Sequence, residues 1–181
     1  MSAQDEAAGA PPPPEFSRPV AADKIGRGGL AVEIEANSAE RAALARRFGL
    51  AALDALQALC RLKPVAGGMI ELACDFAAKA TQECVVTLTP VAADIAQGFT
   101  VRYAPSPVAP GAGGGDDIDL EADDPPEAME GGAIDLGEAV AQHLALALDP
   151  YPRAPGARFA GGEGEKTANP FAILSKLKGK S

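Results

Sequence analysis

The chain has 181 residues, a formal net charge of -9, no tryptophan and few aromatic side chains, so we expect a modest core built from Leu, Val, Ile and Ala. No apolar run approaches the length of a membrane span, and the amino terminus lacks the basic start and apolar centre of a secretory signal. We therefore expect one cytosolic domain with appendages.

Charge is distributed unevenly along the chain. No lysine or arginine occurs between Arg102 and Arg153, and acidic residues are concentrated in the segment 116–130 of that gap. Like charges in a block repel one another, which favours a solvated loop. Because an acidic surface repels phosphates, any contact with nucleic acid has to be local.

The amino-terminal segment 1–14 is small, polar and proline-rich, so we predict that it is disordered and that a single domain spans 15–160. Within this domain, 15–20 and 30–36 have the composition of short strands. The second of them shows the alternation of a half-buried strand, with three apolar residues on one face: Leu30, Val32 and Ile34.

A first helix is predicted over 38–48. Asn37 is suited to the N-cap position, and Glu40, three residues later, completes the pattern of a capping box. Gly49 marks the expected end of the helix. The segment 50–63 that follows fits either a continuing helix or a strand, because its apolar residues satisfy both periods.

The centre of the chain carries the clearest strand pattern. After a turn at 64–68, four apolar residues alternate along one face: Ile70, Leu72, Cys74 and Phe76. The β signal continues through 83–90, where Pro90 ends the strand or places it at an edge. A further strand has four residues on one face: Ile95, Phe99, Val101 and Tyr103. Short turns between successive strands predict an α+β fold whose antiparallel sheet, open or barrel-like, runs from about 16 to 104.

A long loop rich in proline, glycine and aspartate spans 104–132, and a loop of this length is either functional or disordered. A second helix is predicted over 134–148, with Asp135 as its N-cap and Glu138 at the capping-box position. Its buried stripe is expected to contain Leu136, Val140, Leu144 and Leu148. The prolines that follow end this helix.

Neither a metal site nor a catalytic site is predicted. The three cysteines, Cys60, Cys74 and Cys84, form no Cys-x-x-Cys pair and are interpreted as reduced structural thiols, although Cys74 and Cys84 could face each other across a hairpin. A structural zinc site needs about four ligands, and the single histidine, His143, lies far along the chain with apolar neighbours. We therefore expect no cofactor and a structural role for His143.

Basic residues gather on the first helix. Arg41, Arg46 and Arg47 lie close together in the sequence, and Arg61 and Lys63 could lie nearby. The cluster is a candidate for contacts with phosphates. The alternative is that these arginines are simply solvated on the surface of the helix and bind nothing.

The carboxy-terminal segment 161–181 combines a Gly/Glu linker with a short basic amphipathic helix. Asn169 is suited to the N-cap and Pro170 to the first helical position. The predicted docking helix has an apolar stripe and lysines near its end: Phe171, Ile173, Leu174, Leu177, Lys176 and Lys178. Because an isolated helix shorter than ~12–15 residues is marginal in water, we expect it to dock on a partner, on its own domain or on the acidic loop.

Four stretches of the sequence carry a resemblance to a known family. They are QECVVTLTPV (82–91), VRYAP (101–105), IDLGEAVAQHLALALDPYPR (134–153) and NPFAILSKLK (169–178). In this order they make the chain similar to the YceD family, the large ribosomal RNA subunit accumulation proteins, and ERAALARRFGL resembles its alphaproteobacterial branch. The resemblance implies a non-enzymatic cytoplasmic factor needed for the synthesis, processing or stability of 23S rRNA.

The resemblance also bears on the cysteines and on the partner. Relatives in other branches carry a Cys-x-x-Cys pair at the central turn, whereas here Cys84 matches the first position and Thr87 occupies the second. The implied partner is a precursor of the large ribosomal subunit, through its 23S rRNA or a ribosomal protein. One alternative is an acidic, chaperone-like module that holds a basic ribosomal protein without RNA contact. A third is a nuclease, against which the missing metal constellation argues.

Overall fold

The computed structural model describes residues 13–105, 125–129 and 131–159. Its elements, in chain order, are β1 (Pro19–Ala21), η1 (Ala22–Lys24), β2 (Leu30–Glu35), α1 (Ser38–Phe48), β3 (Ala52–Pro64), η2 (Ala66–Gly68), β4 (Ile70–Glu83), β5 (Pro90–Ala104), β6 (Glu127–Ala128), β7 (Ala133–Asp135) and α2 (Leu136–Ala147). Most of the predicted amino-terminal disorder, of the acidic loop and of the tail lies outside the described residues.

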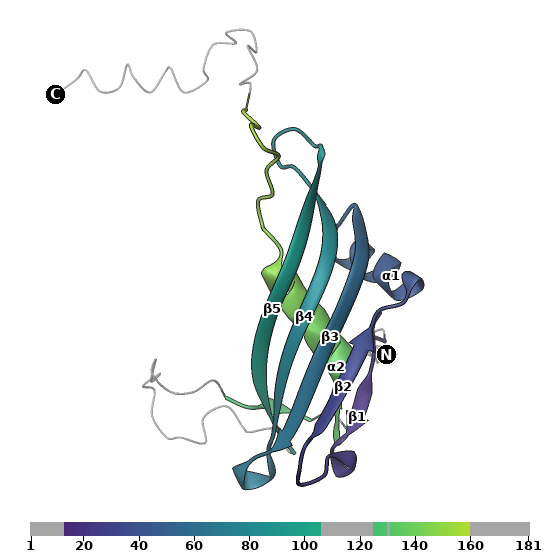
Figure 1. The fold of residues 1–181 in the computed structure, drawn as a ribbon, viewed down its shortest axis with the longest axis vertical. Coiled ribbons are helices and arrows are strands. Elements are labelled where there is room, and N and C mark those ends of the chain that lie inside the picture. The colour runs from purple at the N-terminus through teal and green to yellow at the C-terminus, as the bar shows by residue number, and fades with distance from the viewer. Residues whose placement is uncertain (1–12, 106–124, 130, 160–181) are drawn as a thin grey trace, which may run out of the picture.

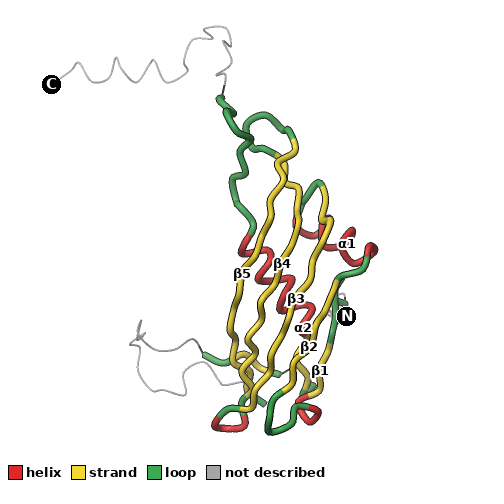
Figure 2. Tube along the Cα trace, in the orientation of Figure 1, coloured by secondary structure: helices red, strands yellow, loops and turns green. Residues whose placement is uncertain are grey.

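Five strands form the main sheet, in the order β2-β3-β4-β5-β6. Neighbours are antiparallel except β5 and β6, and β1 and β7 form a separate antiparallel pair. Figures 1 and 2 show β3, β4 and β5 side by side over the length of the molecule. Among the described strands the sheet stays open, so the α+β fold is confirmed in its open form. The strand predicted over 15–20 is reduced to β1, whose one partner among the described strands is the short β7.

Helix α2 crosses one face of this sheet and buries it, as Figure 1 shows. Leu136, Val140 and Leu144 of the predicted stripe are fully buried, whereas Leu148 lies just beyond the helix and is partly buried. The inward row predicted on β4, from Ile70 to Phe76, is also buried. No helix among the described residues is long and apolar enough to cross a membrane.

The ambiguous segment 50–63 forms strand β3 and not a helix. Leu56, Cys60 and Leu62 are buried while Gln57 and Arg61 are exposed, which is the period of a strand. β2 and β4 pair with β3 on its two sides. Hydrogen bonding to distant parts of the chain therefore decides between two periods that the sequence satisfies equally.

Helix α1 begins and ends as predicted. The Asn37 side-chain oxygen accepts hydrogen bonds from the backbone N–H groups of Ala39 and Glu40, at 2.9 and 3.0 Å. In return, the Glu40 carboxylate accepts one from the Asn37 N–H, at 2.8 Å, which completes the capping box. Gly49 ends the helix in the left-handed region with a φ of 65°.

The predicted continuation of the β signal through 83–90 is wrong. β4 ends at Glu83, a turn follows, and Pro90 begins β5 instead of ending a strand. The Leu88 N–H donates to the Cys84 carbonyl at 2.9 Å, and Leu88 has a positive φ of 59°. These turn contacts outweigh the β propensity of the intervening side chains.

The start of α2 differs from the prediction by one short strand. Ala133–Asp135 pairs with β1, so the helix begins at Leu136 and not at 134. The Asp135 carboxylate caps it as predicted and accepts from two backbone N–H groups of the first turn, at 3.0 and 3.2 Å. Glu138 was expected to complete a capping box there, but its carboxylate binds Arg47 of α1 instead.

Candidate functional site

The predicted docking helix lies outside the described residues, within 160–181. Its proposed contact residues therefore stay a prediction: Asn169, Pro170, Phe171, Ile173, Leu174, Lys176, Leu177 and Lys178. The described chain ends at Phe159, whose side chain is largely exposed. The structure does describe the path of the chain from the end of α2 to Phe159.

The segment that follows α2 is attached to the turn between β4 and β5. The Val85 N–H donates to the Pro152 carbonyl at 2.9 Å. The side-chain amide of Gln82 donates to the Asp149 carbonyl at 2.8 Å. The chain that continues into the predicted docking helix is thus attached beside this turn, at one end of the sheet (Figure 1).

Cys84 is the buried centre of this attachment. Its sulfur accepts hydrogen bonds from the backbone N–H groups of Ala154, at 3.2 Å, and Thr87, at 3.4 Å. The hydrogen bond from Ala154, together with those from the turn, lowers the pKa of the Cys84 thiol to about 7. Because the side chain is fully buried, the sulfur connects the turn to the segment after α2 and does not face solvent.

Two of the predicted phosphate-contact residues, Arg41 and Arg46, line one groove between α1 and the start of β3. The groove has a volume of about 450 Å³ and is also lined by Asp54. Arg41 donates from Nη1 to the Ala36 carbonyl at 2.6 Å, so its side chain is partly fixed. Arg46 is exposed in the last helical turn. The structure therefore brings these two residues to a surface that solvent reaches.

The third predicted residue, Arg47, does not line this groove and is held by carboxylates. It donates to both oxygens of Glu138 on α2, at 2.8 and 2.9 Å, and to Glu15 at 3.0 Å. These bonds, above all those to Glu138, raise the pKa of Arg47 above its usual value. Arg47 therefore joins α1 to α2, and a phosphate would have to compete with two carboxylates for it.

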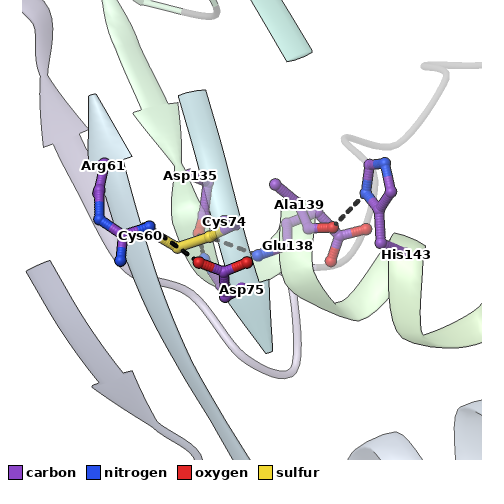
Figure 3. Close-up of a disulfide and its surroundings, with 9 residues drawn as sticks. Cys60, Arg61, Cys74, Asp75, Asp135, Glu138, Ala139 and His143 are labelled. Carbon is purple, nitrogen blue, oxygen red and sulfur yellow. Dashed lines mark hydrogen bonds and ion pairs between the residues drawn. A yellow bond between two sulfur atoms is a disulfide. The ribbon is translucent and has the colours of Figure 1, made fainter. Parts of the chain in front are cut away.

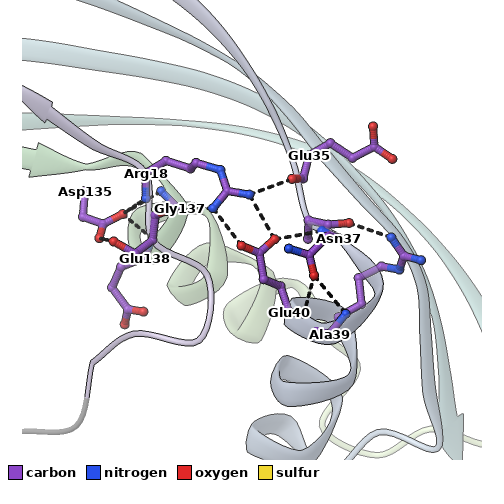
Figure 4. Close-up of polar contacts among 11 residues, drawn as sticks. Arg18, Glu35, Asn37, Ala39, Glu40, Asp135, Gly137 and Glu138 are labelled. Atoms are coloured by element: carbon purple, nitrogen blue, oxygen red, sulfur yellow. Dashed lines mark hydrogen bonds and ion pairs between the residues drawn. The ribbon is translucent and has the colours of Figure 1, made fainter.

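A second ion pair, which the sequence did not indicate, ties the amino-terminal segment to the start of α1 (Figure 4). Arg18 donates to the two oxygens of Glu40 at 2.8 and 3.0 Å, and to the Glu35 carbonyl at 3.1 Å. The hydrogen bonds from Arg18 lower the pKa of Glu40 below its usual range. The Arg18 N–H also donates to Asp135 at 2.8 Å, so one residue connects β2, α1 and the N-cap of α2.

Cys60 and Cys74 are directly paired on β3 and β4, with their Cα atoms 4.2 Å apart, and they form a disulfide (Figure 3). The prediction of reduced thiols is therefore wrong for this pair, and Cys74 faces Cys60 and not Cys84. The reason is the register of two strands, which the sequence does not reveal. Among the residues that the structure describes, no group of three or more His, Cys, Asp and Glu side chains could hold a metal ion.

His143 takes part in the packing of α2 on the sheet. Its ring stacks on Phe99 of β5, with the centroids 3.6 Å apart and the planes 7° from parallel. Its Nδ1 lies 2.9 Å from the Ala139 carbonyl oxygen (Figure 3). These contacts support the predicted structural role.

The opposite face of the sheet carries an acidic groove, lined by Glu33 and Glu35 of β2 and Asp75 of β4 among others. Its volume is about 680 Å³. Arg61 pairs with Asp75 at 2.8 Å, which leaves the two glutamates as its main charges. Such a groove repels phosphates and favours cationic groups.

Comparison with known proteins identifies the family. The family described as large ribosomal RNA subunit accumulation protein YceD matches residues 72–178, which is more than half of the chain. No curated protein and no solved structure matches the chain. The matched range takes in most of β4, all of β5 and α2, and the sequence of the predicted docking helix. The chain therefore belongs to the YceD family of large ribosomal RNA subunit accumulation proteins.

Proposed function

We propose that the protein is a non-enzymatic, cytoplasmic ribosome biogenesis factor that supports the synthesis, processing or stability of 23S rRNA by binding a large-subunit precursor. The observation that carries this proposal is the family match over 72–178. That range includes both the turn that anchors the segment after α2 and the predicted docking helix. In this proposal, the helix at 169–178 supplies the apolar docking contact, and its lysines face an acidic or phosphate-rich surface.

We propose further that Arg41 and Arg46 add phosphate contacts from their groove. This assignment is supported by the solvent access of the groove that the two arginines line. Arg47 contributes only where a phosphate replaces its carboxylate partners, Glu138 and Glu15.

The test is co-sedimentation of the full chain with large-subunit precursors, compared with a variant that lacks 169–181. Loss of association and lower 23S rRNA levels are expected for the truncated chain. Arg46→Glu should weaken association at low salt and reduce its salt dependence. Arg27→Glu, at an exposed loop position, makes the same change in net charge and should have no comparable effect. If the truncated chain and Arg46→Glu both associate normally, the proposed contacts are wrong.

A second candidate function is favoured by the acidic groove on the open face of the sheet. In this case the protein holds a basic ribosomal protein before assembly and touches no RNA. Crosslinking in cells separates the two: contacts to rRNA support the first function, and contacts only to a ribosomal protein support the second. Glu33→Lys combined with Glu35→Lys should abolish capture of a basic protein and leave RNA association intact or stronger.

A further inference from the structure

One edge of strand β5 has no strand partner over most of its length in the described part of the chain. On its inner side, β4 pairs with it without a register shift from Pro90 to Tyr103. On its other side, the only described pairing is with β6, at Tyr103 and Ala104. Figure 1 shows this edge at the border of the sheet. The backbone groups along it are a template for another strand.

The sequence of β5 has few of the devices that usually protect such an edge. Proteins blunt exposed edges with charged side chains, lysine above all, and with prolines, bulges or a covering element. In β5 the only proline is the first residue, Pro90, there is no lysine, and the pairing with β4 contains no bulge. At the opposite side of the sheet, β2 has only 6 residues, and the Arg18 guanidinium binds the carbonyl of its last residue, Glu35. Of the two sheet edges in the described part of the chain, β5 is therefore the less protected one.

The residues of β5 are complementary to a second copy of themselves. In an antiparallel pair with two-fold symmetry about Gly98, Asp94 of each copy lies opposite Arg102 of the other, in addition to the ion pair that Arg102 makes with Glu71 of its own β4. On the face that carries α2, half-buried Ile95 lies opposite Val101. Symmetric registers centred on a neighbouring residue do not place the two opposite charges together. The register about Gly98 is thus singled out by charge and keeps both apolar faces on the same side of the joined sheet.

We propose that β5 is a dimerisation edge at which residues 94–102 pair antiparallel with the same residues of a second copy. The interface is isologous, because the same patch serves both copies, and it closes as a dimer. The paired segment cannot extend past residue 102, because β6 already pairs with β5 at Tyr103. The helices α2 of the two copies then lie on one face of a continuous sheet, and both acidic grooves lie on the other.

The first experiment measures the oligomeric state of the full chain by sedimentation equilibrium across micromolar concentrations. We expect a monomer–dimer equilibrium. Asp94→Arg should raise the dissociation constant on the order of tenfold or more, because it places like charges together at two symmetry-related positions. Arg102→Asp should act similarly, and the double variant Asp94→Arg with Arg102→Asp should restore dimerisation. Asp23→Arg, an equal change of charge on exposed η1, is the control that should dimerise normally.

A second experiment reports the register itself. On the exposed face, Ala96 of one copy lies opposite Thr100 of the other, so a variant with Ala96→Cys and Thr100→Cys should form a covalent dimer on oxidation. Each single variant is the matched control and should not, because its two cysteines are separated by several residues. Thermal unfolding confirms that every variant is folded. A chain that stays monomeric overturns the proposal. So does a dimer whose dissociation constant is unchanged by Asp94→Arg, or a yield of covalent dimer that is as high for the single cysteine variants as for the double variant.

Discussion

Replacing Glu40 with alanine should lower the free energy of unfolding by about 2 kcal/mol. Its carboxylate accepts two hydrogen bonds from Arg18, at 2.8 and 3.0 Å, and one from the Asn37 N–H, at 2.8 Å. A hydrogen bond between a backbone N–H and a charged group contributes about 1.5 kcal/mol. The Arg18 pair adds roughly 0.5–1 kcal/mol, since the arginine side chain is 34% exposed and solvent screens the interaction.

The assay is urea unfolding followed by circular dichroism at pH 7, in a double-mutant cycle with Arg18→Ala. The coupling energy between Glu40 and Arg18 should be about 1 kcal/mol. Glu35→Ala is the matched control: it removes an exposed carboxylate nearby but keeps the backbone carbonyl that Arg18 binds, so it should cost less than about 0.5 kcal/mol.

The same pair predicts a dependence on pH. Because Arg18 lowers the pKa of Glu40 in the folded protein, the stabilisation is complete above the unfolded pKa of about 4.3 and is lost as the pH falls through the folded pKa. The stability difference between wild type and Glu40→Ala should therefore shrink below about pH 4. A cost below about 0.5 kcal/mol at pH 7, or a difference that stays constant down to pH 3, would refute this reasoning.

Two further predictions concern packing and the contact between the helices. Gly137→Ala should cost at least about 2 kcal/mol, because its new Cβ would collide with the Phe16 carbonyl oxygen, whereas Gly26→Ala, with open space around it, should be nearly neutral in the same thermal melts. Arg47→Ala should cost about 1 kcal/mol in urea unfolding, because it removes the ion pairs with Glu15 and Glu138, and the exposed Arg46→Ala should cost under about 0.5 kcal/mol. Equal effects of Arg47→Ala and Arg46→Ala would contradict the assignment of Arg47 to the helix–helix contact.

The elements that could be predicted are those whose cause is local. The capping box joins Asn37 and Glu40, three positions apart, and the stripe of α2 follows from the helical period. The inward face of β4 follows from strict alternation. The prediction of a strand after Glu83 was wrong because the turn there is held by contacts with the segment after α2, such as the hydrogen bond from Val85 to Pro152.

The candidate site could be predicted only in part, because its ion pairs join distant residues. Arg18 and Glu40 are 22 positions apart and Arg47 and Glu138 are 91 apart, and no sequence pattern relates them. Arg47 lies outside the groove that Arg41 and Arg46 line because Glu138 of α2 holds its guanidinium, a contact between residues far apart in the sequence. The pairing of Cys60 with Cys74 depended on a strand register that was equally out of reach.

The length of β5 sets a fixed spacing between two oppositely charged parts of the chain. The stretch that leads to the acidic segment 116–130 leaves one end of the strand at Pro105, and the chain toward the basic tail leaves beside the turn at the other end. A strand of 15 residues spans about 50 Å. The sheet therefore holds the points at which the chain leaves toward its acidic segment and toward its basic tail at opposite ends of one long strand.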